Sequence, residues 1–111
     1  MRDHFQEFDI SPEIVNEMTA AGEDLVLVDV REDWEWEKSH IEGAIHIPLG
    51  ELPRRLDELE PEQTTILYCH TGERSVDACL ILWDAGFRKV RNLMGGIDLW
   101  SEVIDPEVPK Y

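Results

Sequence analysis

The stretch Leu25-Val26-Leu27-Val28-Asp29-Val30 decides the fold class of this 111-residue chain. It is apolar except for one aspartate, it is rich in β-branched valine, and it shows no alternation of apolar and polar positions. Such a run is typical of a strand that is covered on both faces, as the central strands of parallel sheets are. We therefore expect a parallel sheet with this stretch in its interior.

Strand and helix patterns alternate on both sides of that stretch. Ser11-Pro12-Glu13 combines an N-cap residue, a proline at the first helical position and an acid in the first turn, which predicts a helix that continues to about Ala21, with Ile14, Val15 and Met18 as its apolar stripe. The other expected elements are a short helix at 34–39, a short strand at 44–47, a helix at 49–59, a strand at 64–69, a helix at 75–85, a strand at 90–93 and a final helix after Gly95-Gly96. Parallel neighbours need helical crossovers, so this alternation predicts an α/β fold with a mainly parallel sheet.

Length and charge limit the classes of function. A chain of this size is expected to form one small domain. The 25 acidic against 10 basic side chains give a formal charge of −15, and the basic residues form no stripe, so we expect no nucleic-acid binding. A basic protein partner would be attracted to such a chain. The alternative is that the acids are only solvated surface or an adaptation to a salty habitat.

The apolar stretches are too short for a membrane span, which needs about 20 residues. Residues 1–7 contain no apolar segment of the signal-peptide type. These two observations predict a cytoplasmic protein with no membrane association.

Two cysteines, Cys69 and Cys79, are too few for a disulfide framework. Cys79 falls on an apolar face of the helix at 75–85 and is expected to be a buried small hydrophobe. The alternative is a resolving thiol for Cys69, which would require the two Cα atoms to lie within about 7 Å of each other. The four histidines show no ligand spacing, so no metal and no other cofactor is expected.

Cys69 ends the strand at 64–69, and a short loop containing Gly72 then leads into the helix at 75–85. Ligands of parallel sheets bind beyond the carboxyl ends of the strands. A tight loop before a helix N-terminus points backbone N–H groups inward, and the helix dipole adds to their positive field. A free thiol with a pKa of about 8.5 is only about 3% ionised at pH 7, so such a cradle, aided by Arg74, would favour the reactive thiolate. We therefore predict that Cys69 is an ionised and accessible nucleophile. The alternative is that it only fills the end of a core strand.

Four segments in order resemble a single-domain rhodanese. They are DVRE at 29–32, HIEGAIHIP at 40–48, YCHTGERS at 68–75 and NLMGGIDLW at 92–100. The resemblance covers about residues 8–104, and it implies that residues 1–111 form a single rhodanese domain. It implies a rhodanese-like α/β fold, with a mainly parallel sheet of about five strands flanked by helices on both faces.

The same resemblance implies a sulfurtransferase. Cys69 would take a sulfane sulfur from thiosulfate or a persulfide, hold it as a persulfide, and pass it to a nucleophilic acceptor. Asp29 would support the site, either as a structural partner of Arg31 or beside an Arg31 that contacts the substrate anion. His70 would either donate to the substrate or occupy a tolerant loop position. The implied substrate-binding residues are Arg31, His70, Thr71, Gly72, Glu73, Arg74 and Ser75.

Two alternatives remain within the resemblance. Phosphatases of this fold have five residues between the cysteine and the arginine, whereas only four separate Cys69 from Arg74. A non-catalytic interaction module is the other alternative. Because Glu73 stands next to Arg74 in an acidic chain, electrostatics favours a neutral or protein-bound persulfide donor over the dianion thiosulfate.

Overall fold

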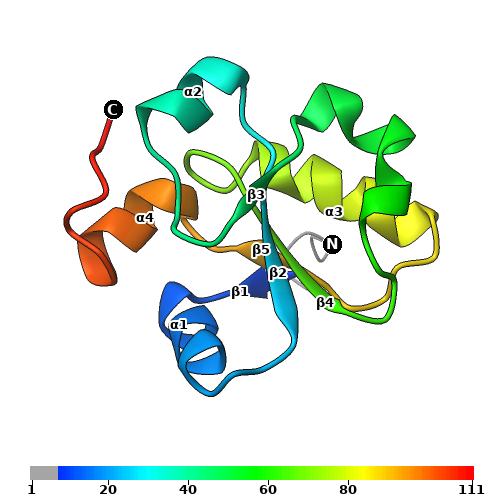
Figure 1. Cartoon of the computed structure of the whole chain (residues 1–111), viewed down its shortest axis with the longest axis horizontal. Coiled ribbons are helices and arrows are strands. Elements are labelled where there is room, and N and C mark those ends of the chain that lie inside the picture. Colours follow the sequence, from blue (N-terminus) through cyan, green and yellow to red (C-terminus); the bar gives the residue numbers. More distant parts are fainter. Residues whose placement is uncertain (1–7) are drawn as a thin grey trace, which may run out of the picture.

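The computed structural model describes residues 8–111, which are built around a five-stranded sheet (Figure 1). The strand order is β1-β5-β4-β2-β3, and every neighbouring pair is parallel. The strands are β1 (Asp9–Ile10), β2 (Leu25–Asp29), β3 (Ile45–His46), β4 (Thr64–Tyr68) and β5 (Val90–Leu93). The predicted α/β class and parallel sheet are therefore confirmed.

Helices cover both faces of this sheet. Figure 1 shows α1 and α4 on one side and α3 with the two 3-10 helices on the other. The short α2 follows β2 beyond the carboxyl ends of the strands. The helices are α1 (Pro12–Ala20), α2 (Asp33–Lys38), η2 (Leu49–Arg54), η3 (Leu56–Glu58), α3 (Arg74–Asp84) and α4 (Gly96–Val103).

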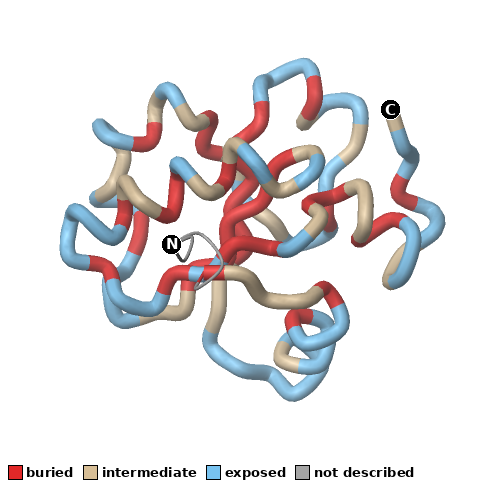
Figure 2. Tube along the Cα trace, turned by 180° about the vertical axis from the view of Figure 1, so that it is seen from behind, coloured by how far each residue is buried: buried red, intermediate tan, exposed pale blue. Residues whose placement is uncertain are grey.

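The two inner strands contribute side chains alternately to two apolar clusters. Val28 of β2 and Leu67 of β4 belong to the cluster that contains Leu82 of α3. Leu27 and Ile66, one position earlier on the same two strands, belong to the cluster that includes helix α4. Successive strand side chains point to opposite faces, so a strand covered twice has to be apolar at consecutive positions. Figure 2 shows the resulting buried centre of the molecule.

The chain departs from the predicted elements at residues 49–59. The leucine spacing predicts one α-helix there, but the structure has two short 3-10 helices, η2 and η3. Pro53 lies inside η2, where it lacks a backbone N–H and disfavours a continuous α-helix. Leu52 and Leu59 are nevertheless buried on the α3 face of the sheet. The leucine spacing therefore predicts the buried side chains correctly, but the predicted α-helix is wrong.

Three smaller differences concern short elements. β1 has no counterpart among the predicted elements, because two residues carry no periodic signal. The strand predicted at 44–47 is reduced to β3. The first helix begins as predicted, with the Ser11 side chain accepting from the Ile14 amide at 3.2 Å, but the Ile14 side chain is 50% exposed and does not join the core.

Within residues 8–111, no helix is both long enough and apolar enough to cross a membrane. The prediction that residues 1–7 lack a signal segment concerns residues outside the described part of the chain.

The start of α4 lies directly against the loop that follows β4. The amide of Ile97 donates to the Cys69 carbonyl at 3.0 Å, and the amide of Asp98 donates to the His70 carbonyl at 3.1 Å. Gly96 has a φ of +60°, and a Cβ there would lie 2.5 Å from both carbonyl oxygens. Only glycine allows this approach, so Gly96 positions the loop as well as starting the helix.

We predict that Gly96→Ala lowers the free energy of unfolding by about 2–4 kcal/mol, because it combines a left-handed backbone with a clash against backbone atoms. The thermal unfolding midpoint should fall by roughly 10 °C. Gly50→Ala is the matched control, since a Cβ at Gly50 meets nothing within 4 Å. Equal midpoints for the two variants would contradict the proposed role of the contact.

Candidate functional site

Cys69 follows the last residue of β4 and lies on the α3 face of the sheet. Its position at a strand carboxyl end is the predicted one. The residue is only 1% exposed, however, so the expectation of an accessible thiol is wrong. Cys69 packs in the apolar cluster on the α3 face, and the loop at 70–73 brings the Gly72 amide against the sulfur.

Two polar groups contact the Cys69 sulfur. The Gly72 amide donates to Sγ at 3.1 Å, and the Ser75 Oγ lies 3.4 Å from Sγ. The loop therefore turns at least one backbone N–H toward the sulfur, as predicted for a tight loop before a helix N-terminus. Ser75 is the second residue of α3, and its hydroxyl turns inward to the sulfur instead of capping the helix.

Asn92 of β5 connects the parts of the loop that surround the sulfur. Its side-chain amide donates to the Gly72 carbonyl at 3.2 Å and to Asp9 at 3.0 Å, so its oxygen is left to accept the Ser75 hydroxyl proton. The Ser75 hydroxyl has one proton, which it donates to the Asn92 side-chain oxygen. The Ser75 oxygen can then accept from a Cys69 thiol, while the Gly72 amide is the donor that remains for a thiolate.

Arg74 begins α3 directly after the loop and is paired with a buried acid. Its guanidinium forms a two-pronged bond to the Glu35 carboxylate of α2, at 2.7 and 2.8 Å. Hydrogen bonding to Arg74 holds the pKa of Glu35 at about 2, well below its usual range, against the opposing effect of burial. Glu35 raises the pKa of Arg74 in turn. Glu35 is not among the predicted site residues, because nothing in the sequence of an acidic helix marks one carboxylate as buried.

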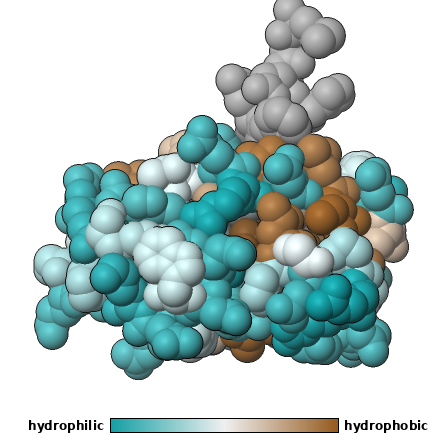
Figure 3. Space-filling view, turned by 90° about the horizontal axis from the view of Figure 1, so that it is seen from above, coloured by the Kyte–Doolittle hydropathy of each residue, from teal (hydrophilic) through white to brown (hydrophobic). Residues whose placement is uncertain are grey.

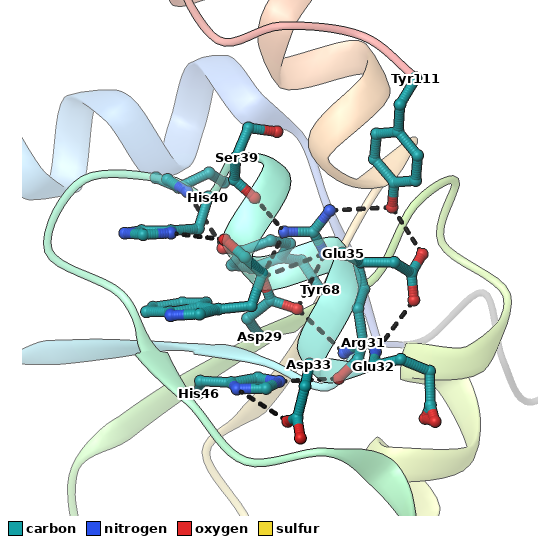
Figure 4. Close-up of polar contacts among 12 residues, drawn as sticks. Asp29, Arg31, Glu32, Asp33, Glu35, Ser39, His40, His46, Tyr68 and Tyr111 are labelled. Atoms are coloured by element: carbon teal, nitrogen blue, oxygen red, sulfur yellow. Dashed lines mark hydrogen bonds and ion pairs between the residues drawn. The ribbon is translucent and has the colours of Figure 1, made fainter.

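Arg31 and Asp29 form a second ion pair, and both are fully buried (Figure 4). The Arg31 Nη2 is 2.6 Å from both Asp29 and the Ser39 carbonyl, and Nη1 donates to the Tyr111 hydroxyl at 2.8 Å. Burial alone would lower the pKa of Arg31, but its bonds to Asp29 and Tyr111 outweigh this and raise it. This geometry favours the structural alternative for Arg31 over direct contact with a substrate anion.

The remaining loop side chains lie at the surface of the site. Thr71 donates to Glu73 at 3.3 Å in an exposed position. The His70 ring stacks on the Tyr111 ring, with the centroids 4.3 Å apart. Tyr111 is not among the predicted site residues, because the sequence between α4 and this tyrosine has no periodic pattern that indicates a return to the loop.

The second cysteine is separate from these contacts. Cys79 lies fully buried on α3, and burial raises the pKa of its thiol to about 12. The expected burial is confirmed, and both cysteines are free thiols. Across residues 8–111 there is no group of three or more His, Cys, Asp and Glu side chains that could hold a metal ion.

Comparison with known proteins agrees with this geometry. Residues 11–103 match the family described as Rhodanese-like domain. A Bacillus subtilis protein named as a sulfur carrier protein, YrkF, is 40% identical over 93 residues, which are 84% of this chain and 50% of that protein. The chain thus spans about half the length of this relative.

Two further matches extend over nearly the whole of both proteins. The sulfurtransferase of Allochromatium vinosum is 33% identical over 103 residues, covering 89% of this chain and 96% of that protein. The crystal structure of a rhodanese-related protein from Thermoplasma volcanium has a TM-score of 0.77 and 29% identity, covering 91% of this chain and 94% of that one.

Glu35→Gln is predicted to destabilise the protein in a pH-dependent way. A carboxylate whose pKa falls from 4.5 to about 2 on folding stabilises the folded state above pH 4.5, and this contribution disappears as the pH falls through about 2. At pH 7 the variant should lose roughly 2 kcal/mol, the scale of bonds to charged groups. Urea unfolding at several pH values measures the difference.

Glu37→Gln, an exposed position on the same helix, serves as the control and should change little. A Glu35→Gln deficit that stayed constant from pH 7 to pH 2 would show that the carboxylate charge is not the cause.

Proposed function

The chain belongs to the rhodanese-like domain family, and we propose that it acts as a sulfurtransferase that carries a sulfane sulfur on Cys69 as a persulfide. Sulfurtransferase relatives at moderate identity support sulfur transfer as the type of reaction. The observation that carries the assignment to Cys69 is the bond from the Gly72 amide to its sulfur, at the carboxyl end of an inner strand.

In the first step the Cys69 thiolate attacks the outer sulfur of the donor. With a persulfide donor, R–S–S⁻, the donor S–S bond breaks and the thiolate R–S⁻ leaves with the electron pair. With thiosulfate, the leaving group is sulfite. The product in both cases is Cys69–S–S⁻, and neither reaction needs an external oxidant or reductant.

In the second step an acceptor nucleophile, such as a thiolate, attacks the terminal sulfur of the persulfide. The S–S bond to Cys69 breaks, its electron pair returns to the Cys69 sulfur, and the acceptor departs with the added sulfur. The Cys69 thiolate is thereby regenerated. The loop has to stabilise a sulfur anion in every state of this cycle, so fixed backbone N–H groups suit it better than a base that takes up a proton.

The backbone of the loop is oriented by its contact with α4. The carbonyls of Cys69 and His70 point at the amides of Ile97 and Asp98. A trans peptide unit holds its N–H opposite to its C=O, so the amides of His70 and Thr71 point away from α4. We propose that these amides, with that of Gly72, receive the terminal sulfur.

The ion pairs of the site bear on the identity of the donor. Arg74 is neutralised by Glu35, and Arg31 is buried against Asp29. Neither guanidinium is a free cation for an incoming dianion. We therefore propose that a persulfide, either small or bound to a protein, is the preferred donor, and that thiosulfate is used less efficiently.

The surface and the charge bear on a protein partner. Seen from the α2 side of the molecule, the surface is mostly hydrophilic, with apolar side chains gathered in one area (Figure 3). A formal charge of −15 would speed the approach of a basic partner. We propose such a protein as the sulfur donor or acceptor.

Treatment with cysteine persulfide or thiosulfate should add the mass of one sulfur atom to the protein, as measured by intact mass spectrometry. Cys69→Ser should abolish the gain, because it removes the only proposed carrier. Cys79→Ala, the control for the other thiol, should retain it.

The same samples separate the alternatives. Hydrolysis of an aryl phosphate without any sulfur gain would favour a phosphatase. Absence of both activities would favour an interaction module, and each of these results would contradict the proposal.

The rate with thiosulfate is predicted to rise several-fold when salt is increased from 10 mM to about 150 mM, because screening weakens the repulsion between the dianion and the acidic protein. The rate is measured as the amount of sulfite released at fixed times after thiosulfate is added. Alkylation of Cys69 by uncharged iodoacetamide is the control and should change little. A thiosulfate rate that falls with salt would reveal a net attractive site and contradict the proposed donor preference.

A further inference from the structure

Tyr111 lies far from Cys69 in the sequence but contacts groups on both sides of the cysteine loop. Its hydroxyl donates to Glu35 at 2.6 Å and accepts from Arg31 at 2.8 Å. Its ring stacks on His70, with an interplanar angle of 18°, and meets the edge of Trp34 with the centroids 5.8 Å apart. Figure 4 shows the tyrosine reaching from its own segment to Glu35 and Arg31.

These contacts hold the loop at its two ends. His70 immediately follows Cys69 and is held directly by the stacked ring. Arg74 closes the loop at the start of α3 and is held through Glu35, because the Glu35 oxygen that accepts from Tyr111 also accepts from Arg74 at 2.8 Å. One side chain thus restrains the entry and the exit of the loop that covers the sulfur.

The segment that carries Tyr111 is attached to the molecule independently of the loop. Ser101 of α4 donates to the Val108 carbonyl at 2.5 Å, and Ser39 donates to the Pro109 carbonyl at 3.3 Å. Lys110 pairs with Glu102 at 2.5 Å. These bonds keep the segment in place when Tyr111 is altered, so they make Tyr111 a fixed anchor for the loop.

Because Cys69 is buried, the anchoring of the loop affects access to the Cys69 sulfur. Cys69 is only 1% exposed and the Gly72 amide of the loop lies 3.1 Å from its sulfur, so movement of the loop is a route by which a donor reaches it. We propose that Tyr111 is a positioning residue that holds the loop closed over Cys69 and so restricts the size of the donors and acceptors that reach it. This inference rests on the proposed function for its meaning, but the access it describes can be measured without any sulfur donor.

The test compares two uncharged alkylating reagents of different size, iodoacetamide and N-phenylmaleimide, on the full chain from pH 5 to pH 9. The Cys69 peptide is followed by mass spectrometry, which separates it from Cys79. Both reagents react with the thiolate, so the ratio of their rates cancels the ionised fraction and reports access.

Tyr111→Phe keeps the ring on His70 and loses the hydroxyl bonds to Glu35 and Arg31, so it should raise the ratio of large-reagent to small-reagent rates about tenfold, the scale of one bond to a charged group. Tyr111→Ala also loses the stacked ring, so its ratio should rise further. Glu107→Gln, an exposed position on the same segment whose side chain makes none of the bonds above, is the control and should leave the ratio unchanged. The pH at which alkylation is half-maximal reports separately on the ionisation of the thiol.

An unchanged ratio in Tyr111→Phe and Tyr111→Ala would overturn the proposal. If Tyr111→Ala lowers the unfolding midpoint, Tyr111→Phe decides alone, because it removes only one oxygen atom. If the wild-type protein gains no sulfur from persulfide or thiosulfate, the sulfurtransferase proposal fails, whereas the alkylation ratios still decide whether Tyr111 controls access.

Discussion

The close approach of α4 to the cysteine loop is the constraint on which the site depends. The backbone of Gly96 lies where any side chain would collide with the carbonyl oxygens of Cys69 and His70. The loop contributes its own glycine to this approach, since a Cβ at Gly72 would lie 3.3 Å from the Gly95 nitrogen. Helix amides then hold the loop carbonyls on one side, and the loop is left to present N–H groups elsewhere. Gly95 and Gly96 at the start of α4 and Gly72 in the loop thus determine how Cys69 is surrounded.

The charged residues around this contact neutralise one another instead of creating a strongly positive pocket. Arg31 is bonded to Asp29, and Arg74 to Glu35, with Tyr111 bridging the two pairs. Breaking one member of a buried pair leaves an uncompensated charge, so such pairs fix geometry more than they add attraction for a ligand. The polar contacts of the Cys69 sulfur are with the Gly72 amide and the Ser75 hydroxyl and not with either guanidinium. This separates the stabilisation of a sulfur anion from the long-range capture of anionic substrates.

The sequence is sufficient to predict the parts of the structure that depend on regular spacing. The apolar run around Val28 indicates an inner parallel strand, and the short glycine-containing loop after Cys69 indicates a turn that directs a backbone N–H at the sulfur. It is insufficient where the outcome depends on contacts between distant segments. The burial of Cys69, the selection of Glu35 among many surface acids and the return of Tyr111 to the loop all arise from tertiary packing. Pro53 is a different case. The leucine spacing predicts one continuous α-helix at 49–59, although a proline inside a helix disfavours it and can be read directly from the sequence.

The most direct measurement of the central claim is a crystal structure of the protein after treatment with cysteine persulfide. The account predicts a second sulfur bonded to Cys69, enclosed by the loop, with the amides of His70, Thr71 and Gly72 directed at it and the contact between α4 and the loop intact. A second sulfur that points away from these amides, or a loop that has to leave α4 to accommodate it, would contradict the account.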